Sequence, residues 1–444
     1  MKNNDEHTGP VRVRIAPSPT GNLHIGTGRA GLFNYLFAKQ HKGTFIVRVE
    51  DTDVARSTKE FEQNMIDAFT WLGLTWDEFY RQSERTDIYK SYLRKMIDGG
   101  FAYESQEEVK EEGQRASVIR FKNPNRVVTF QDLIRGEISV DTTDLGDFVI
   151  AKSFDEPLYH LAVVVDDHEM NISHVIRGDD HVSNTPRQIL IQEAIGATKP
   201  IYAHIPLILS KERKKLSKRD GATALTDYRD KGYMKDAMVN FLAFMGWHPE
   251  GDEEVLSSDQ LIEQFDISRV QKGGAIFDTE KLDWFNREYI KKISDEQFAK
   301  IVNEYSSVQI SDPTILALIR ERVVVFGDIA NLVAPTGELG HLVYDITIED
   351  MGKLVWKDST PEQAKEFLTH VISTIEALDD SDFTPEKLKE ALWDYASEKG
   401  RGAVLWPTRY ALSGQDRSPD PFSLMSILGK EKSLVRLRNA ADRL

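Results

Sequence analysis

Apolar residues in the first hundred positions of the chain recur with two different periods. Residues 11–16 carry an apolar side chain at every second position, which is typical of a strand, and residues 27–40 have the spacing of a helix. The same succession returns as a strand at 44–50 and a helix at 59–71, which Gly73 would end. This alternation of strands and helices predicts a parallel sheet with right-handed crossovers.

Residues 101–155 break this pattern and are predicted to form an inserted connective region. Its short apolar runs predict strands at 118–121, 127–130 and 148–152. After the insertion, further strands are predicted to continue the main sheet, at 161–165 and 172–177.

From Asp236 onward the spacing of apolar residues is helical, and residues 300–444 are predicted to be entirely helical. Prolines fall near the predicted helix boundaries, at Pro313, Pro335, Pro361 and Pro385. The fold class is therefore α/β, with a Rossmann-type, doubly wound parallel sheet followed by a helical part. The predicted divisions are a polar tail (1–10), the first half of the α/β domain (11–100), the insertion (101–155), the second half of the α/β domain (156–235), a helical region (236–300) and a helical domain (301–444).

The composition is that of a globular protein, since 29% of the 444 residues are charged and 40% are hydrophobic. No apolar run approaches the ~20 residues of a membrane span. The polar residues 1–10 lack the apolar core of a signal peptide, so we expect a cytoplasmic protein that does not enter a membrane. The sequence contains no cysteine, which excludes disulfides and thiolate metal sites.

The net charge of −16 argues by itself against a nucleic-acid partner. Binding to RNA needs only a local basic surface, however, and residues 211–219 form one basic cluster. A second group of basic residues lies near the C-terminus, at Arg401, Arg409, Lys430, Lys432, Arg436 and Arg438. Charge alone therefore does not predict RNA binding.

The turn between the first strand and the first helix carries candidate chemistry. Two prolines and Gly21 force a tight connection, and His24 and Gly26 fall where the helix begins. Free N–H groups and a partial positive charge at a helix start suit a phosphate chain. A plain turn with a surface histidine has a similar sequence, and simple nucleotidyl transferases carry a related turn, so this feature alone is weak.

A second segment, residues 214–221, places lysines and an arginine beside Ser217 and Gly221. Such a basic, flexible loop can close over a triphosphate, although basic runs are more often solvated surface. Together the two segments predict a nucleotide site.

These segments resemble the two nucleotide motifs of class I aminoacyl-tRNA synthetases, usually written HIGH and KMSKS. They stand here as His24-Ile25-Gly26-Thr27 and Lys215-Leu216-Ser217-Lys218-Arg219. Further segments extend the resemblance to the bacterial glutamyl-tRNA synthetase family over nearly the whole chain, at 48–53, 159–168, 175–181, 184–188 and 241–247. Many bacterial relatives carry a cysteine-rich zinc loop in the insertion. This chain has none, so we expect no structural zinc and no metal site of its own.

The resemblance implies that the protein activates L-glutamate with ATP, accompanied by Mg²⁺, and transfers it to tRNA(Glu). It implies a helical anticodon-binding domain and a monomer, and it leaves open whether tRNA(Gln) is also charged. Glutaminyl-tRNA synthetase and a non-catalytic tRNA-binding paralogue remain as alternatives. A shorter relative that attaches glutamate to a modified tRNA base is disfavoured because it lacks the helical third of this chain.

Matched positions imply roles for individual residues. The implied catalytic residues are His24, Lys215 and Lys218, and the implied ATP-binding residues are His24, Gly26, Thr27, Asp180, His181 and Lys218. The implied glutamate-binding residues are Arg14, Ala16, Ser18, Glu50, Tyr159 and Arg177. The two arginines would hold the side-chain carboxylate and Glu50 the α-ammonium group. Arg409 would read the anticodon. The simpler alternatives are surface charges at strand ends and, for Arg409, an arginine that binds a helix C-terminus.

Overall fold

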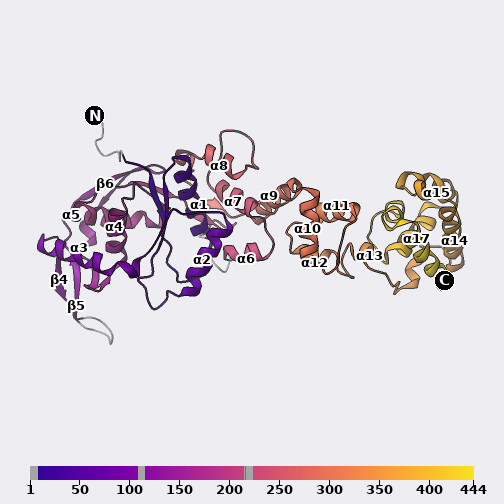
Figure 1. Cartoon of the computed structure of the whole chain (residues 1–444), viewed down its shortest axis with the longest axis horizontal. Coiled ribbons are helices and arrows are strands. Elements are labelled where there is room, and N and C mark those ends of the chain that lie inside the picture. The colour runs from indigo at the N-terminus through magenta and orange to yellow at the C-terminus, as the bar shows by residue number, and fades with distance from the viewer. Residues whose placement is uncertain (1–8, 109–115, 215, 217–223) are drawn as a thin grey trace. The chain divides into compact units, whose positions relative to one another are not determined.

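The computed structural model describes residues 9–108, 116–214, 216 and 224–444. The chain forms two compact units, residues 1–289 and 290–444, and each is described by itself (Figure 1). The predicted residues Lys215 and Lys218 lie outside the described residues.

The first unit contains the predicted parallel strands. Strands β1 (Arg12–Ile15), β2 (Thr44–Val49) and β3 (Glu78–Arg81) pair in parallel in the order β1-β2-β3. Helices α1 (Ile25–Gln40) and α2 (Lys59–Trp71) connect them. The predicted strand–helix–strand order is confirmed, and α2 has the predicted bounds. Its start is fixed because the Thr58 side chain accepts a hydrogen bond from the N–H of Phe61.

A second group of strands continues this sheet. Strand β10 (His174–Gly178) pairs in parallel with β11 (Ile201–Ile205), and the hairpin of β6 (Val127–Asp132) and β7 (Gly136–Asp141) follows in the order β10-β11-β6-β7. The N–H of Ser173, just before β10, donates to the carbonyl of Arg12 in β1 at 2.9 Å. The first parallel strands and β10 therefore lie side by side, and part of the insertion extends the main sheet.

The rest of the insertion forms an antiparallel sheet in the order β4-β5-β8-β9. Its strands are β4 (Ala102–Gln106), β5 (Ser117–Phe121), β8 (Phe148–Ser153) and β9 (Glu156–Pro157). The strands predicted at 118–121, 127–130 and 148–152 are confirmed as β5, β6 and β8. Strands β4 and β7 were missed because neither has a clear apolar face. In β7, partly buried side chains alternate with exposed ones, and in β4 only Ala102 is buried.

The predicted strand at 161–165 is wrong, because these residues lie in helix α4 (Tyr159–Glu169). All five side chains are buried, so the apolar run has no polar face that would reveal a helical period. A fully buried helix and a fully buried strand look alike in such a short run. The strand predicted at 172–177 is confirmed as β10.

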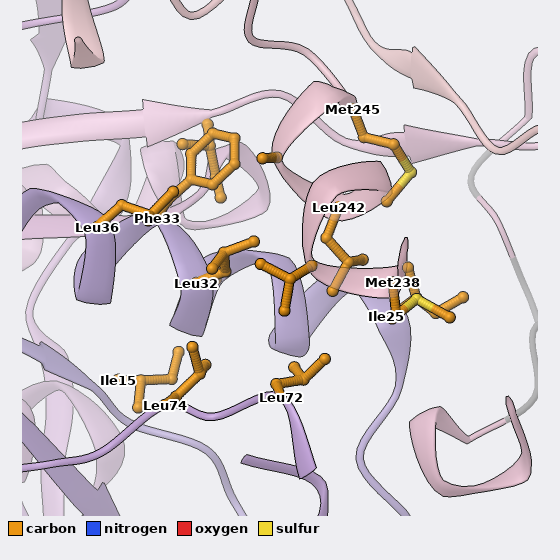
Figure 2. Packing of buried hydrophobic residues seen from close by; sticks show 14 of the residues in the cluster. Ile15, Ile25, Leu32, Phe33, Leu36, Leu72, Leu74, Met238, Leu242 and Met245 are labelled. Atoms are coloured by element: carbon orange, nitrogen blue, oxygen red, sulfur yellow. The ribbon is translucent and has the colours of Figure 1, made fainter. Parts of the chain in front are cut away.

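The core of the first unit lies on both faces of the sheet. Phe45, Val47 and Val49 of β2 belong to one buried cluster and Ile46 to another, which is the alternation of a strand covered on both sides. Figure 2 shows the first cluster, in which α1 presents Ile25 and Leu32 between the sheet side and helix α7 (Lys235–Phe244). This packing holds the start of α1 against the strand ends that precede it.

The remaining elements of the first unit surround these layers. They are helices α3 (Thr86–Asp98), α5 (Thr185–Ile195), α6 (Leu225–Asp230), α8 (Ser258–Gln264) and α9 (Thr279–Lys292), and the short parallel strands β12 (Ile208–Leu209) and β13 (Ala275–Ile276).

The second unit contains helices and connecting segments but no strand in residues 290–444, which confirms the helical character predicted for residues 300–444. Its helices after α9 are α10 (Asp295–Tyr305), α11 (Pro313–Arg322), α12 (Asp328–Leu332), α13 (Gly340–Val343), α14 (Pro361–Glu376), α15 (Pro385–Lys399), α16 (Arg401–Ser413) and α17 (Pro421–Arg443). Pro313, Pro361 and Pro385 each occupy the first position of a helix, where the missing N–H costs no hydrogen bond. In the described parts of the chain, no helix combines the length and apolar character needed to cross a membrane.

Candidate active site

A cavity of about 530 Å³ opens where β1, β2 and β10 end and α1 begins. The carboxyl ends of parallel strands meet at one edge of a sheet, which is where ligands bind in folds of this type. Every described residue that the sequence assigned to glutamate or ATP lines this cavity: Arg14, Ala16, Ser18, His24, Gly26, Thr27, Glu50, Tyr159, Arg177, Asp180 and His181. Leu216, the described residue between the two predicted lysines, lines it as well.

The start of α1 forms one wall of the cavity. His24 is the N-cap residue in an extended conformation, and its side chain does not cap the helix. The Thr27 hydroxyl lies 3.5 Å from Nε2 of His24. A Cβ added at Gly26 would lie 3.2 Å from the His24 ring, so a larger residue would crowd the imidazole. The first N–H groups of α1 are therefore left for a ligand rather than for a capping side chain.

A network of buried charges lies behind the opposite wall. Arg14 donates from Nε and Nη2 to the two carboxylate oxygens of Asp167, at 3.0 and 3.4 Å. Arg48, which is fully buried, donates to Asp167 at 2.7 Å and to Glu50 at 3.2 Å. Asp167 is thus shared between two guanidinium groups, and this fixes Arg14 at the cavity edge.

The neighbouring Asp166 holds the other end of this network. Its carboxylate accepts from Arg85 at 2.6 Å, from Gln82 at 2.9 Å and from the hydroxyl of Tyr89 at 2.8 Å. Asp166 and Asp167 both come from the last turns of α4, the helix that the sequence pattern did not reveal. The end of α4 therefore anchors α3 and the strand β2 to the site.

The sequence interpretation assigned no site role to Arg48, Asp166 or Asp167. The signal was present, because Arg48 interrupts the apolar strand β2 and the two aspartates end the apolar run of α4. A charge inside an apolar run needs a partner of opposite sign when the run is buried. The sequence does not say which partner, since Arg48 and Asp167 are separated by 119 positions.

Burial sets the ionisation of these acids differently. Burial raises the pKa of Glu50 to about 7, although Arg48 and Arg14 partly oppose this shift. Burial would also raise the pKa of Asp167, but the attraction of Arg14 and Arg48 is stronger, and the pKa of Asp167 lies below its ordinary value. Near neutral pH, Asp167 is a carboxylate and Glu50 takes up or releases a proton easily.

Arg177 brings a second guanidinium to the cavity. It is only 7% exposed, and it donates from Nη2 to the Thr185 hydroxyl at 2.8 Å and from Nε to His204 at 3.1 Å. Its Nη1 atom is buried and has no hydrogen-bond partner. A buried cationic donor without a partner is costly, and a ligand carboxylate would supply the missing acceptor.

Tyr159 and His181 complete this side of the cavity. The Tyr159 hydroxyl lies 3.0 Å from Nδ1 of His181. Burial, together with the charge of Arg177, lowers the pKa of His181 to about 4, so the imidazole is neutral at neutral pH. The positive charge of the cavity therefore comes from the arginines.

Comparison of the sequence with known proteins shows the family to which the chain belongs. Residues 10–116 and 104–284 match the family described as tRNA synthetases class I (E and Q), catalytic domain, and residues 270–441 match the family described as anticodon binding domain. The glutamate–tRNA ligase of Carboxydothermus hydrogenoformans is 39% identical over 97% of this chain and 99% of its own length. That of Bacillus subtilis is 37% identical over 97% of this chain and 99% of its own. The chain belongs to the glutamate–tRNA ligase family.

Solved structures of this family have the same fold. The crystal structure of a glutamate tRNA ligase from Elizabethkingia meningosepticum, in complex with its amino acid, matches with a TM-score of 0.85 and 33% identity, over 98% of this chain and 100% of that one. The glutamate–tRNA synthetase of Elizabethkingia anophelis matches with a TM-score of 0.82 and 32% identity. The predicted fold class, a class I catalytic domain followed by a helical anticodon-binding domain, is confirmed.

Arg409, the residue assigned to the anticodon, lies in the second unit on α16. Its guanidinium carbon is 4.7 Å from the centroid of the Trp406 ring, and Nη2 donates to the carbonyl of Asp416 at 2.9 Å. Trp406 in turn lies 5.3 Å from Trp356, measured between ring centroids. The bond to Asp416, just beyond the end of α16, fits the simpler alternative, while the adjacent aromatic rings fit the stacking of RNA bases.

In the part of the chain that the structure describes, no three histidine, aspartate or glutamate side chains gather as a group that could hold a metal ion.

Proposed function

We propose that this protein activates L-glutamate with ATP to glutamyl adenylate and transfers the glutamyl group to the 3′-terminal ribose of tRNA(Glu). The observation that carries the proposal is the placement of two buried guanidinium groups, Arg14 and Arg177, in one cavity with Glu50. Glutamate brings two carboxylates and an ammonium group. Arg14 and Arg177 are two cations for the side-chain carboxylate, and Glu50 is an acid for the ammonium group, so these three residues complement the charges of the amino acid.

The proposed binding mode uses each of these groups once. Arg177 donates from its unpaired Nη1 to the side-chain carboxylate of glutamate, and Arg14 faces the same carboxylate while Asp167 keeps it in place. Glu50 accepts from the α-ammonium group. Ala16, Ser18 and Tyr159 line the cavity and are proposed to complete the walls of the glutamate site without adding a charged group.

The proposed ATP site lies at the start of α1. His24 and Thr27 face the phosphates, and Gly26 leaves room for the adenosine part, with Asp180 and His181 on the other side of the cavity. An oxygen of the glutamate α-carboxylate attacks the α-phosphorus, and the bond to pyrophosphate breaks. Negative charge grows on the leaving pyrophosphate, so groups that neutralise it accelerate the step.

Lys215 and Lys218 are proposed to supply that neutralisation. In the sequence they lie on either side of Leu216, which lines the cavity. Their positive charges would stabilise the leaving pyrophosphate. Mg²⁺ bound to ATP supplies further positive charge on the phosphate oxygens. In the second step, the terminal ribose hydroxyl of tRNA attacks the carbonyl carbon of the mixed anhydride and AMP leaves.

The charge of the cavity favours glutamate over glutamine as the amino acid. A glutamine side chain is neutral and would leave Arg177 with an uncompensated buried charge. A non-catalytic paralogue is disfavoured because every described residue predicted for the two substrates lines the cavity. The proposal also includes a monomeric cytoplasmic enzyme, as the resemblance implies.

The second unit is proposed to bind the anticodon stem-loop of tRNA(Glu), with Arg409 and its neighbouring tryptophans against the bases. Whether tRNA(Gln) is also charged depends on how Arg409 meets the base that differs between the two tRNAs. A variant with Arg409→Gln is expected to change the ratio of charging between the two tRNAs, and an unchanged ratio would remove Arg409 from this role.

The direct test is aminoacylation with labelled glutamate or labelled glutamine, using purified tRNA(Glu) and tRNA(Gln) separately. Glutamate on tRNA(Glu) alone supports a discriminating enzyme, and glutamate on both supports a non-discriminating one. Charging with glutamine contradicts the proposed amino acid. Tight tRNA binding without any charging contradicts the proposed reaction and supports the paralogue.

A further inference from the structure

Behind Arg177, three neighbouring strands bring together side chains that the proposed reaction does not use. Arg177 on β10 lies directly opposite His204 on β11 in the parallel register, and Asp132 ends β6, which pairs with β11 at Tyr202. His204 is 0% exposed and Asp132 is 4% exposed. Neither side chain lines the cavity.

Hydrogen bonds fix the tautomer of His204. An arginine Nε–H can only donate, so the 3.1 Å contact from Arg177 requires a lone pair on Nε2 of His204. The ring proton must then be on Nδ1, which donates to Oδ2 of Asp132 at 2.7 Å. Asp132 therefore determines which nitrogen of His204 faces Arg177.

Asp132 is itself held in one orientation. Its Oδ1 accepts from the N–H groups of Ile134 and Arg135 at 3.0 and 2.8 Å, and Oδ2 also accepts from the N–H of His204 at 3.0 Å. Burial opposes ionisation of Asp132, but these donors and the His204 ring outweigh it, and the pKa of Asp132 lies below its ordinary value. Burial lowers the pKa of His204, so the pair consists of a carboxylate and a neutral imidazole.

This pair leaves Arg177 only one free donor group. Nε is bound to His204, and Nη2 is bound to the Thr185 hydroxyl and, at 3.5 Å, to the carbonyl of His181. These bonds fix the plane of the guanidinium, and Nη1 is the nitrogen without a partner. The ring of Tyr202 lies 5.8 Å from the guanidinium carbon and is stacked on His204. Without the His204 acceptor, the guanidinium could rotate and lose this presentation of Nη1.

We propose that Asp132 and His204 are positioning residues for recognition of the glutamate side chain, because Asp132 holds His204 in the tautomer that accepts from Arg177. The inference rests on the proposed function and adds to it a contribution from the inserted region, which supplies Asp132. The insertion thereby takes part in amino-acid specificity as well as in the sheet.

The first test is Asp132→Asn in the full-length protein. An amide that turns its NH₂ group to His204 reverses the tautomer, so that a ring N–H faces the Nε–H of Arg177. An amide turned the other way points its NH₂ at the N–H groups of Ile134 and Arg135. We expect the KM for glutamate to rise about 10- to 100-fold, a range typical of residues that orient a ligand-binding side chain. The KM values for ATP and tRNA(Glu) should stay within about threefold.

A pair of His204 variants separates the hydrogen bond that positions Arg177 from the loss of the imidazole ring itself. Glutamine can place its amide oxygen near the site of Nε2 and can still accept from Arg177, whereas asparagine reaches only the site of Nδ1 and keeps the bond to Asp132. We expect the KM for glutamate in His204→Gln to stay close to the wild-type value. In His204→Asn it should rise as much as in Asp132→Asn. Equal KM values for glutamate in the two His204 variants would overturn the proposal.

The matched control is Thr142→Val, which removes a buried hydroxyl from the residue that follows β7 in the same hairpin. Thr142 is 0% exposed and bonds to the carbonyl of Arg126 at 2.7 Å, away from Arg177. We expect a loss of stability without a change in the KM for glutamate. A rise equal to that of Asp132→Asn would show that general loosening of the hairpin is responsible, and would overturn the proposal.

The tautomer has its own readout. In protein with nitrogen-15-labelled histidine, the His204 signals should show a protonated Nδ1 in the wild type, and a protonated Nε2 in the wild type would overturn the proposal. In Asp132→Asn, a protonated Nε2 identifies the amide that turns its NH₂ group to His204. Wild-type protein that charges glutamine but not glutamate would refute the proposed function. Wild-type glutamate charging, with an unchanged KM for glutamate in Asp132→Asn, would refute only the positioning role.

Discussion

The ionisation of Glu50 should make the proposed recognition of glutamate dependent on pH. Burial raises the pKa of Glu50 to about 7 in the cavity without a ligand. The proposed partner, the α-ammonium group of glutamate, binds the carboxylate form and not the protonated form. As the pH falls through 7, Glu50 takes up a proton and the affinity for glutamate should fall with it.

The magnitude follows from the titration of one group. An acid with a pKa of about 7 is ~90% ionised at pH 8 and ~10% ionised at pH 6, so the KM for glutamate should be about tenfold higher at pH 6. Over this range the charges of free glutamate do not change. His181 does not contribute either, because its pKa is lowered to about 4.

The assay is the KM for glutamate in aminoacylation of tRNA(Glu), measured between pH 6 and 8 at saturating ATP and tRNA in the wild type and in Glu50→Gln. The KM for glutamate of Glu50→Gln should not change between pH 6 and 8. It should lie about tenfold or more above the wild-type value at pH 8. Glutamine imitates the protonated acid. A flat wild-type profile, or a slope that persists in Glu50→Gln, would refute the reasoning.

The raised pKa of Glu50 also affects the stability of the fold. The stabilising contribution of Glu50 is present at low pH and is lost as the pH rises through 7, so the Glu50→Gln variant should be at least as stable as the wild type at pH 8.

Other predictions follow from single contacts. Arg14→Ala should raise the KM for glutamate about 100-fold, or about 3 kcal/mol, and near-normal kinetics would defeat its assignment. Arg48→Met leaves three buried carboxyl groups without their shared cation, so the free energy of unfolding in urea should fall by about 3–5 kcal/mol; a loss under about 1 kcal/mol would contradict this. Gly402→Ala places a Cβ 2.5 Å from Nε1 of Trp356 and should push that ring away from Trp406. The KM for tRNA(Glu) should then rise about fivefold or more while the KM for glutamate stays unchanged, and an unchanged KM for tRNA would remove these rings from the binding surface.

The sequence by itself determined the elements whose signals are local. The bounds of α2 follow from Thr58, the helical spacing after it and Gly73, whose φ of +75° is a conformation that glycine adopts without strain. Helices α11, α14 and α15 begin at prolines for a similarly local reason. The gathering of Arg14, Glu50 and Arg177 in one cavity was also predictable, since each lies within one residue of the end of a parallel strand.

Only the tertiary structure decided what lies behind that cavity. The buried run of α4 carries no polar face, so its helical form depends on the layers that surround it. The partners of Arg48, the bond from Asp132 to His204 and the pKa of Glu50 all depend on residues far apart in the chain that lose their water together. Desolvation and pairing of charges are properties of the assembled interior, and a pattern read along the chain contains neither.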